Sequence, residues 1–323
     1  MESKLKWIGL ALLIVVLLAL PFFNAQYLIH IAIMTLLNIS MAITLMPLLR
    51  SGLFSVGHAA FMAIGAYTSA ILVTKLGLNF WLSFPLGGVM SGICALAIGF
   101  PILRVKGLFF MLITMGLNEI VHLGINSWSS MTGGPSGIPG IPPPNPISLP
   151  IFGKIEFLSK LPFYYFALFL CVLIFLFIYR IWNSRIGSTC RAIAEDEDLA
   201  KSLGVNVIRY KMLLFCLCCF CTGIVGGFFA HYYGFLAPVD FSVWQSIYFL
   251  IYVQVGGMSI LSGPVVGAAL LTIVSEIFRF VAIYKPVIYG SLIVLIMILF
   301  PEGLISALSL LHSQLRMRGC KSI

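Results

Sequence analysis

Four consecutive acidic residues stand out in a chain of which only 9% is charged. They run from Glu195 to Asp198 within RAIAEDEDLAKSLGVNVIRYK, residues 191–211. Clustered carboxylates could form an ion site or take part in acid–base catalysis. They could also begin a helix, because the backbone dipole is positive in a first turn. The good helix formers around them, followed by Gly204 as a terminating residue, favour one short amphipathic helix.

Other catalytic signatures are missing from the sequence. A phosphate-binding loop would require G-x-x-x-x-G-K, but Ser148 stands in the place of the first glycine before the Gly153-Lys154 pair. There is also no H-E-x-x-H helix and no G-x-S-x-G elbow. We therefore expect no catalytic residue, no ATPase activity, no metal site and no bound cofactor in this chain.

Two acidic residues lie within apolar segments, where a charge is costly and usually paired or exposed to a polar cavity. Glu119 and Glu276 could belong to a proton or ion relay, or they could simply pair with a neighbour. Arg279 lies on the same helix face as Glu276, which favours pairing. For the isolated His58, helix packing or a hydrogen bond is favoured over metal ligation.

The composition requires that these residues be held by membrane helices. The 323 residues are 61% hydrophobic, with a mean hydropathy of +1.09. A span needs roughly 20 residues, since a helix rises about 1.5 Å per residue and the hydrocarbon layer is about 30 Å thick. The fold class is therefore all-α: a polytopic transmembrane helical bundle in a single domain, residues 1–323. About ten spans are predicted, at 7–23, 27–49, 53–74, 81–103, 107–126, 161–179, 212–236, 241–260, 264–283 and 287–311.

The longest charge-free run, from Phe241 to Ser275, cannot be one span. As a single helix its 35 residues would extend about 52 Å and overshoot the membrane. The segment GGMSILSGP supplies the break.

The basic residues predict the orientation, since lysine and arginine concentrate on the cytoplasmic side. With both termini in the cytoplasm, fourteen of the 19 basic residues fall on that side. The net charge of +9 thus reflects topology, and no nucleic-acid binding is expected. Two long connections remain: an external loop at 127–160, where proline and glycine favour polyproline or turn conformations, and a cytoplasmic loop at 180–211. Because the chain lacks its own energy source, the cytoplasmic loop is expected to dock onto a separate subunit.

Two segments rich in small residues, 51–70 and 255–271, are interrupted by glycine or proline at membrane depth. Such positions permit either close helix packing or unwound backbone that lines a substrate pathway. Both alternatives stay open from the sequence. The segments end in similar Gly-Ala pairs, which hints at two related halves.

The sequence resembles the permease subunits of ATP-binding cassette (ABC) importers for branched-chain amino acids. The stretch at 191–211 looks like their cytoplasmic coupling loop. SGLFSVGHAAFMAIGAYTSA, GLFFMLITMGLNEI, MTGGPSGIPGIP and GGMSILSGPVVGA resemble further blocks of that family, in the same order, from about Asn38 to Gly303. The long Gly/Pro loop is more similar to the M-type permease than to the shorter H-type.

The resemblance implies a multi-pass subunit of the cell (inner or cytoplasmic) membrane that imports leucine, isoleucine or valine. Implied partners are a second, LivH-like permease subunit, two cytoplasmic subunits that use ATP and Mg²⁺, and an extracellular solute-binding protein. The coupling site carries over to Arg191, Ala192, Glu195, Ala200, Leu203 and Gly204. Together with Glu119, the candidate translocation pathway comprises Ser55, Gly57, His58, Gly65, Gly256, Gly257, Gly263 and Pro264. Alternatives are a permease for urea, amides or other amino acids, and a proton-coupled secondary transporter.

Overall fold

Helices dominate the computed structural model, which describes residues 26–149, 153–258 and 260–277 and isolated positions between 287 and 298. Five helices in this part of the chain are long and apolar enough to cross a membrane. They are α2 (Gln26–Arg50), α4 (Phe80–Ile102), α5 (Leu108–Ser127), α7 (Lys160–Trp182) and α10 (Val207–Tyr233). Three shorter helices in the described residues pack with them: α3 (His58–Thr74), α11 (Val243–Gly256) and α12 (Gly263–Ile277). The protein is thus a helical membrane protein.

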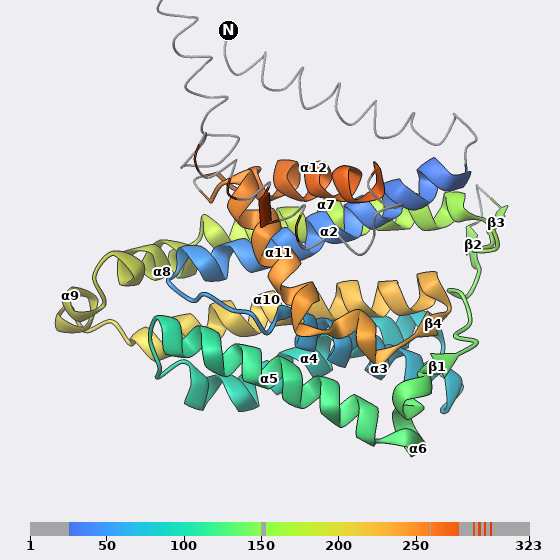
Figure 1. Ribbon diagram of the computed structural model, residues 1–323, viewed down its shortest axis with the longest axis horizontal. Coiled ribbons are helices and arrows are strands. Elements are labelled where there is room, and N and C mark those ends of the chain that lie inside the picture. The colour runs from blue at the N-terminus through green and yellow to red at the C-terminus, as the bar shows by residue number, and fades with distance from the viewer. Residues whose placement is uncertain are drawn as a thin grey trace, which may run out of the picture.

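The long helices lie side by side, so that their connections gather at two opposite ends (Figure 1). One end carries α8 (Arg185–Glu195) and α9 (Glu197–Ser202) and is called the α8–α9 end. The other, the strand end, carries short strands and helical turns. These are α6 (Ser129–Thr132), the 3-10 helices η2 (Gly134–Ser136) and η3 (Pro238–Phe241), β1 (Ile138–Pro139), β2 (Ile147–Leu149), β3 (Gly153–Ile155) and β4 (Phe235–Leu236).

Polar side chains mark where several helices begin. Asn79 accepts a hydrogen bond from the backbone N–H of Trp81 at the start of α4, and Asn206 accepts one from Arg209 at the start of α10. These side chains satisfy N–H groups that have no partner within the helix. Gly234 ends α10 in the left-handed conformation that glycine adopts without strain.

The predicted spans agree with the helices in most places. The prediction of 53–74 is too long at its start, because α3 begins only at His58 and is preceded by irregular backbone. The prediction of 212–236 starts too late, since α10 begins at Val207. The predicted break in the long apolar run is confirmed, with α11 ending at Gly256 and α12 beginning at Gly263. Spans 7–23 and 287–311 lie outside the continuously described residues.

The loop at 127–160 contains more regular structure than its proline and glycine content predicts. It forms α6 and η2, and β1 pairs antiparallel with β4 from beyond α10, matching Ile138 with Leu236. A second antiparallel pair joins β2 to β3. The expectation of polyproline and turns alone was wrong, because the backbone of this loop finds pairing partners both in the chain after α10 and within the loop itself.

Glycines bring α3, α4 and α10 into direct backbone contact at the centre of the bundle. A Cβ atom placed on Gly65 would lie 2.1 Å from the carbonyl oxygen of Gly223, and one on Gly226 would lie 2.1 Å from that of Met62. A Cβ on Gly87 would meet the carbonyl oxygen of Gly65 at 2.6 Å. Helices in a membrane gain stability from such close van der Waals packing.

Candidate functional site

A fully buried polar cluster joins three helices where α3 begins. His58, the first residue of α3, has its Nε2 atom 2.9 Å from Oγ1 of Thr44 on α2 and 2.8 Å from Oγ1 of Thr222 on α10. All three side chains are completely shielded from solvent. We call these three residues the His58 cluster. The hydrogen bonds among these three side chains offset the free-energy cost of burying their bonded polar atoms in the apolar interior.

The irregular backbone before α3 extends this network to α5 and α11. The N–H of Val56 donates to Thr114 Oγ1 at 3.1 Å, and the N–H of Ala59 donates to Ser246 Oγ at 2.8 Å. Ser246 in turn donates to Asn118 Oδ1 at 3.3 Å. Side chains from two helices therefore replace the backbone partners that the first turn of α3 lacks.

Ser55 and Gly57 belong to the same irregular segment. Ser55 is buried, and its hydroxyl accepts a hydrogen bond from the Gly57 N–H at 3.3 Å. Gly57 packs so closely on α5 that a Cβ there would lie 2.9 Å from the carbonyl oxygen of Thr114. The structure thus places the candidate pathway residues Ser55, Gly57 and His58 together, at a break in a helix.

One polar atom of this network lacks a partner among the described residues, the Nδ1 atom of His58. A buried group without a hydrogen bond carries a desolvation cost, typically about 1–3 kcal/mol. Chemically, the Nδ1 atom of His58 is an unused hydrogen-bonding group inside the bundle.

The second group of candidate glycines packs α11 against α12. A Cβ on Gly256 would lie 1.9 Å from the Gly263 carbonyl oxygen, and one on Gly263 would lie 1.9 Å from that of Gly257. Gly257 ends α11 with a φ of 96°, and Pro264 follows Gly263 at the start of α12. These residues, like Gly65, serve close helix packing in this conformation. As with α3, a short apolar helix follows irregular backbone, which parallels the two related sequence segments.

The two membrane acids have different surroundings. Glu276, near the end of α12, accepts a hydrogen bond from the Tyr27 hydroxyl of α2. Its suggested partner Arg279 lies outside the described residues. Glu119 lies on an exposed side of α5 whose other large side chains are apolar. They include Leu108, Leu112, Met115, Ile120 and Leu123.

The acidic stretch forms two helices and not the single helix predicted. Glu195 ends α8, and Asp196 starts α9 by accepting hydrogen bonds from the N–H groups of Asp198 and Leu199 at 3.0 and 2.9 Å. The single-helix prediction was wrong because Asp196 competes for N–H groups that a continuous helix would use. The acids do lie at the start of α9, and Gly204 follows its end with a φ of 81°.

Glu197 is the centre of a group of ion pairs that the sequence did not reveal. Its carboxylate lies 3.1 Å from the Lys106 ammonium, 2.9 Å from Lys201 and 3.0 Å from Lys211. We call these four residues the Glu197 cluster. It ties α9 to the start of α10 and to the connection between α4 and α5. The i,i+4 spacing of Glu197 and Lys201 was the only local signal, since the other two lysines are distant in sequence.

The protonation of Glu197 follows from these contacts. Partial burial alone would raise the pKa of its carboxyl, but hydrogen bonds from Lys201, Lys211 and Lys106 outweigh it and lower the pKa to about 2. The carboxylate is therefore charged at any physiological pH.

The six candidate coupling residues divide into an exposed and an inward-facing set. Ala200 packs with Ile193 and Val207 of the same chain. Arg191 donates to the Trp182 carbonyl oxygen at 2.9 Å and lies over the Trp182 ring, 4.9 Å from its centroid. The exposed set is Ala192, Glu195, Leu203 and Gly204. The small apolar face expected to meet a partner is thus partly used within the chain, while Leu203, with 76% of its surface exposed, is free to contact one.

Comparison with known proteins identifies the family of this arrangement. Residues 24–301 match the model of the branched-chain amino acid transport system permease component. The high-affinity branched-chain amino acid transport system permease protein LivM of Salmonella typhimurium is 33% identical, over 91% of this chain and 73% of the relative. LivM of Escherichia coli is 32% identical, over 92% of this chain and 74% of the relative. LivH of Salmonella typhimurium is 24% identical, over 79% of this chain and 86% of the relative.

No solved structure matches the chain significantly. The match to the family model and the LivM relatives nevertheless cover most of the helical bundle, including both clusters. The chain therefore belongs to the family of branched-chain amino acid transport system permease components, and is LivM-like within it.

Proposed function

We propose that this chain is a membrane-spanning subunit of an ABC importer for leucine, isoleucine and valine. Its partners would be a LivH-like second permease, two cytoplasmic subunits that hydrolyse ATP, and an extracellular solute-binding protein. Movement of the ATP-binding subunits would reach the bundle through α8 and α9. The observation that carries the proposal is the match of residues 24–301 to the permease family model. The Glu197 cluster supports the coupling route, because it links α9 to α10 and to the α4–α5 connection by direct ion pairs.

The distribution of lysine and arginine residues indicates which end of the bundle faces the cytoplasm. Of the basic residues in the continuously described segments, three belong to the strand end, Lys75, Lys154 and Lys160, and nine to the α8–α9 end. These nine are Arg50, Arg104, Lys106, Arg180, Arg185, Arg191, Lys201, Arg209 and Lys211. The excess favours a cytoplasmic α8–α9 end and an external strand end. That orientation presents the exposed coupling residues to cytoplasmic partners. The span count of about ten and the cytoplasmic location of both termini stay part of the proposal.

We place the translocation pathway for the solute, as part of this proposal, around the His58 cluster and along the exposed side of α5. A carboxylate at the position of Glu119 is unfavourable against lipid hydrocarbon. A second permease subunit or a water-filled pathway on this side of α5 would remove that cost. The apolar side chains around Glu119 suit a solute with an aliphatic body.

Reconstitution into proteoliposomes tests the proposal. The chain with all partners should accumulate radiolabelled leucine only when ATP is supplied to the cytoplasmic side, and the chain alone should accumulate none. Accumulation by the chain alone, driven by a proton gradient, would overturn the ABC assignment. Urea, amides and other amino acids are tested as competitors, since relatives with a similar architecture could carry them.

Glu119→Gln separates the ABC importer from the proton-coupled alternative. A coupling carboxylate is indispensable in a proton-driven carrier, whereas in an ATP-driven importer Gln keeps the size and polarity of Glu. We expect leucine uptake by the complete complex to fall by less than about threefold, since Gln still offers polar atoms for hydrogen bonds at this position. Uptake that disappears at every pH would instead favour the proton-coupled carrier.

A further inference from the structure

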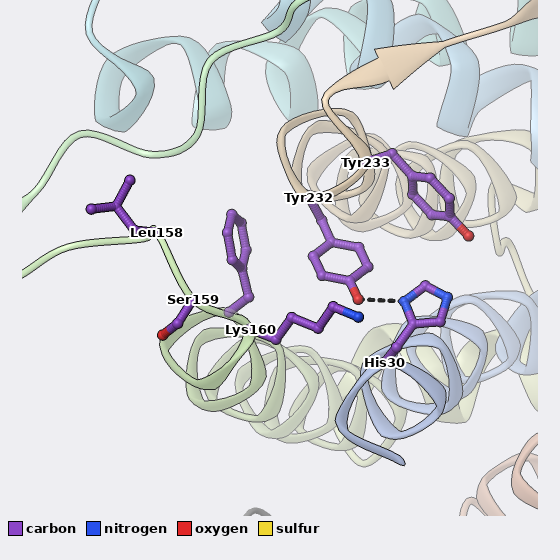
Figure 2. A pocket seen from close by; sticks show the side chains of 7 residues that line it. His30, Leu158, Ser159, Lys160, Tyr232 and Tyr233 are labelled. Atoms are coloured by element: carbon purple, nitrogen blue, oxygen red, sulfur yellow. Dashed lines mark hydrogen bonds between the residues drawn. The ribbon is translucent and has the colours of Figure 1, made fainter. Parts of the chain in front are cut away.

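A cavity lies at the strand end of the bundle, apart from both clusters described above. It has a volume of about 370 Å³ and lies between the start of α2, the start of α7 and the end of α10 (Figure 2). We call it the outer pocket. Its lining residues are His30, Leu158, Ser159, Lys160, Phe163, Tyr232 and Tyr233.

The polar groups of the outer pocket converge on one place. Figure 2 shows the Lys160 side chain extending towards the hydroxyl of Tyr232, which faces the ring of His30. The Tyr232 oxygen lies 2.5 Å from His30 Nδ1. When this ring nitrogen carries a proton, it donates to the Tyr232 oxygen and leaves the tyrosine O–H free to donate into the pocket. Lysine and tyrosine together then present hydrogen-bond donors to a ligand.

The charge in the pocket is positive. None of its seven lining residues is acidic, and no carboxylate in the described part of the chain lies within ion-pair distance of Lys160. The Lys160 ammonium donates a hydrogen bond to the Gln26 carbonyl oxygen at 3.3 Å and has three protons to donate in all. The 23-residue helix α7 also begins here, with the positive end of its dipole at the pocket.

The remaining wall is apolar. The Phe163 ring packs edge-on against Tyr232, with ring centroids 5.3 Å apart, and Leu158 is 83% exposed beside them. A ligand that fits both parts must join an anionic head to an aliphatic body. A bare inorganic anion would use only the polar half of the surface.

We propose that the outer pocket binds the anionic oxygen group, a carboxylate or a phosphate, of a small amphipathic ligand. Lys160 and Tyr232 hold the anion, and Phe163 and Leu158 contact the aliphatic portion. Two sources supply this chemistry: a free amino acid, through its carboxylate, and an anionic phospholipid, through its headgroup phosphate. The choice of leucine as the amino acid rests on the transport function proposed above, whereas binding of an anionic phospholipid does not.

Direct binding to the purified full-length chain tests the proposal. One arm measures radiolabelled leucine by equilibrium dialysis, and the other counts phosphatidylglycerol molecules retained in native mass spectrometry. Phosphatidylcholine, whose phosphate is balanced by its choline ammonium, is the comparison lipid without net charge. Each arm uses the wild type, Lys160→Gln, Lys160→Arg and Tyr232→Phe. Lys75→Gln is the matched control, because Lys75 lies at the same end, binds the Ser130 carbonyl oxygen and does not line the pocket.

One of the two probes, leucine or phosphatidylglycerol, should bind the wild type, Lys160→Arg and the Lys75→Gln control alike. Lys160→Gln should weaken that probe at least about tenfold and Tyr232→Phe a few-fold, since charge-assisted hydrogen bonds are the stronger ones. The probe whose binding is weakened by these substitutions shows whether the ligand is a free amino acid or an anionic phospholipid. The proposal is overturned if neither probe binds, or if Lys160→Gln and Tyr232→Phe both bind as the wild type does.

Discussion

The His58 cluster and the Glu197 cluster hold helices together by opposite means. Each joins three parts of the chain, and α10 belongs to both. The His58 cluster uses hydroxyl groups and one imidazole, all fully shielded from solvent. The Glu197 cluster uses four charged side chains, and more than half of the Lys106 side chain remains exposed.

The difference reflects what each environment permits. Charges are costly inside a membrane bundle, so the interior relies on neutral hydrogen bonds and close glycine packing. Ions at the end of the bundle keep part of their hydration, so their attraction need not repay full desolvation. The interior is therefore joined by neutral hydrogen bonds and close packing, and the end of the bundle by partly hydrated ion pairs.

The largest expected effect is on the interior, from Gly65→Ala. The added Cβ would lie 2.1 Å from the Gly223 carbonyl oxygen, which is backbone and can move only if α3 and α10 separate. We expect a loss of stability of at least about 1–3 kcal/mol and a sharp fall in folded yield on size-exclusion chromatography. Gly116→Ala is the matched control, because a Cβ there meets nothing within 4 Å. Equal yields of the two variants would refute the packing account.

A smaller effect is expected from removing one hydroxyl of the His58 cluster. Thr222→Val preserves shape but deprives His58 Nε2 of one partner, at a cost of about 1–3 kcal/mol. Thr35→Val serves as control, since Thr35 and Thr222 both donate to the carbonyl four residues earlier, but only Thr222 of the two also bonds to His58. Thermal unfolding in detergent should show a lower Tm only for Thr222→Val. An equal drop in both would mean that the cluster adds nothing to stability.

The smallest expected effect is that of a pH change near neutrality on the stability contributed by the Glu197 cluster. The carboxyl has its pKa lowered from 4.5 to about 2, so its stabilising contribution is complete above about pH 4.5 and is lost as the pH falls towards 2. The Tm difference between wild type and Glu197→Gln should therefore stay constant from about pH 8 to 5. A difference that shrinks between pH 7 and 5 would show that the lysines do not hold the carboxylate.

The sequence predicted the bundle well where one local signal sufficed. Span lengths, the break between α11 and α12, and Gly204 at the end of α9 all follow from hydrophobic runs and from the preferences of glycine. The late start of α3 was missed because its first turn is completed by Ser246 from a distant helix. The β1–β4 pair was missed for a similar reason, since its partners are separated by the whole of α7 and α10.

In the candidate sites, too, the sequence revealed the residues with a distinctive type and missed the partners that are distant along the chain. His58 and the glycines were found from their unusual types, but the partners Thr44 and Thr222 look ordinary in an apolar sequence. Among the four acids, Glu195 was singled out by family resemblance, whereas Glu197 makes the ion pairs. Choosing between them required knowing that Lys106 and Lys211 come to the same end of the bundle.

The central claim, that the Glu197 cluster couples ATP hydrolysis to transport, is tested most directly by the number of ATP molecules hydrolysed per leucine imported in proteoliposomes. Glu197→Gln removes the common partner of three lysines, and Asp198→Asn is the control, because Asp198 pairs only with Lys201 in the described part of the chain. We predict that Glu197→Gln inserts and hydrolyses ATP but raises this ratio several-fold, while Asp198→Asn keeps the wild-type ratio. An unchanged ratio in Glu197→Gln would contradict the account.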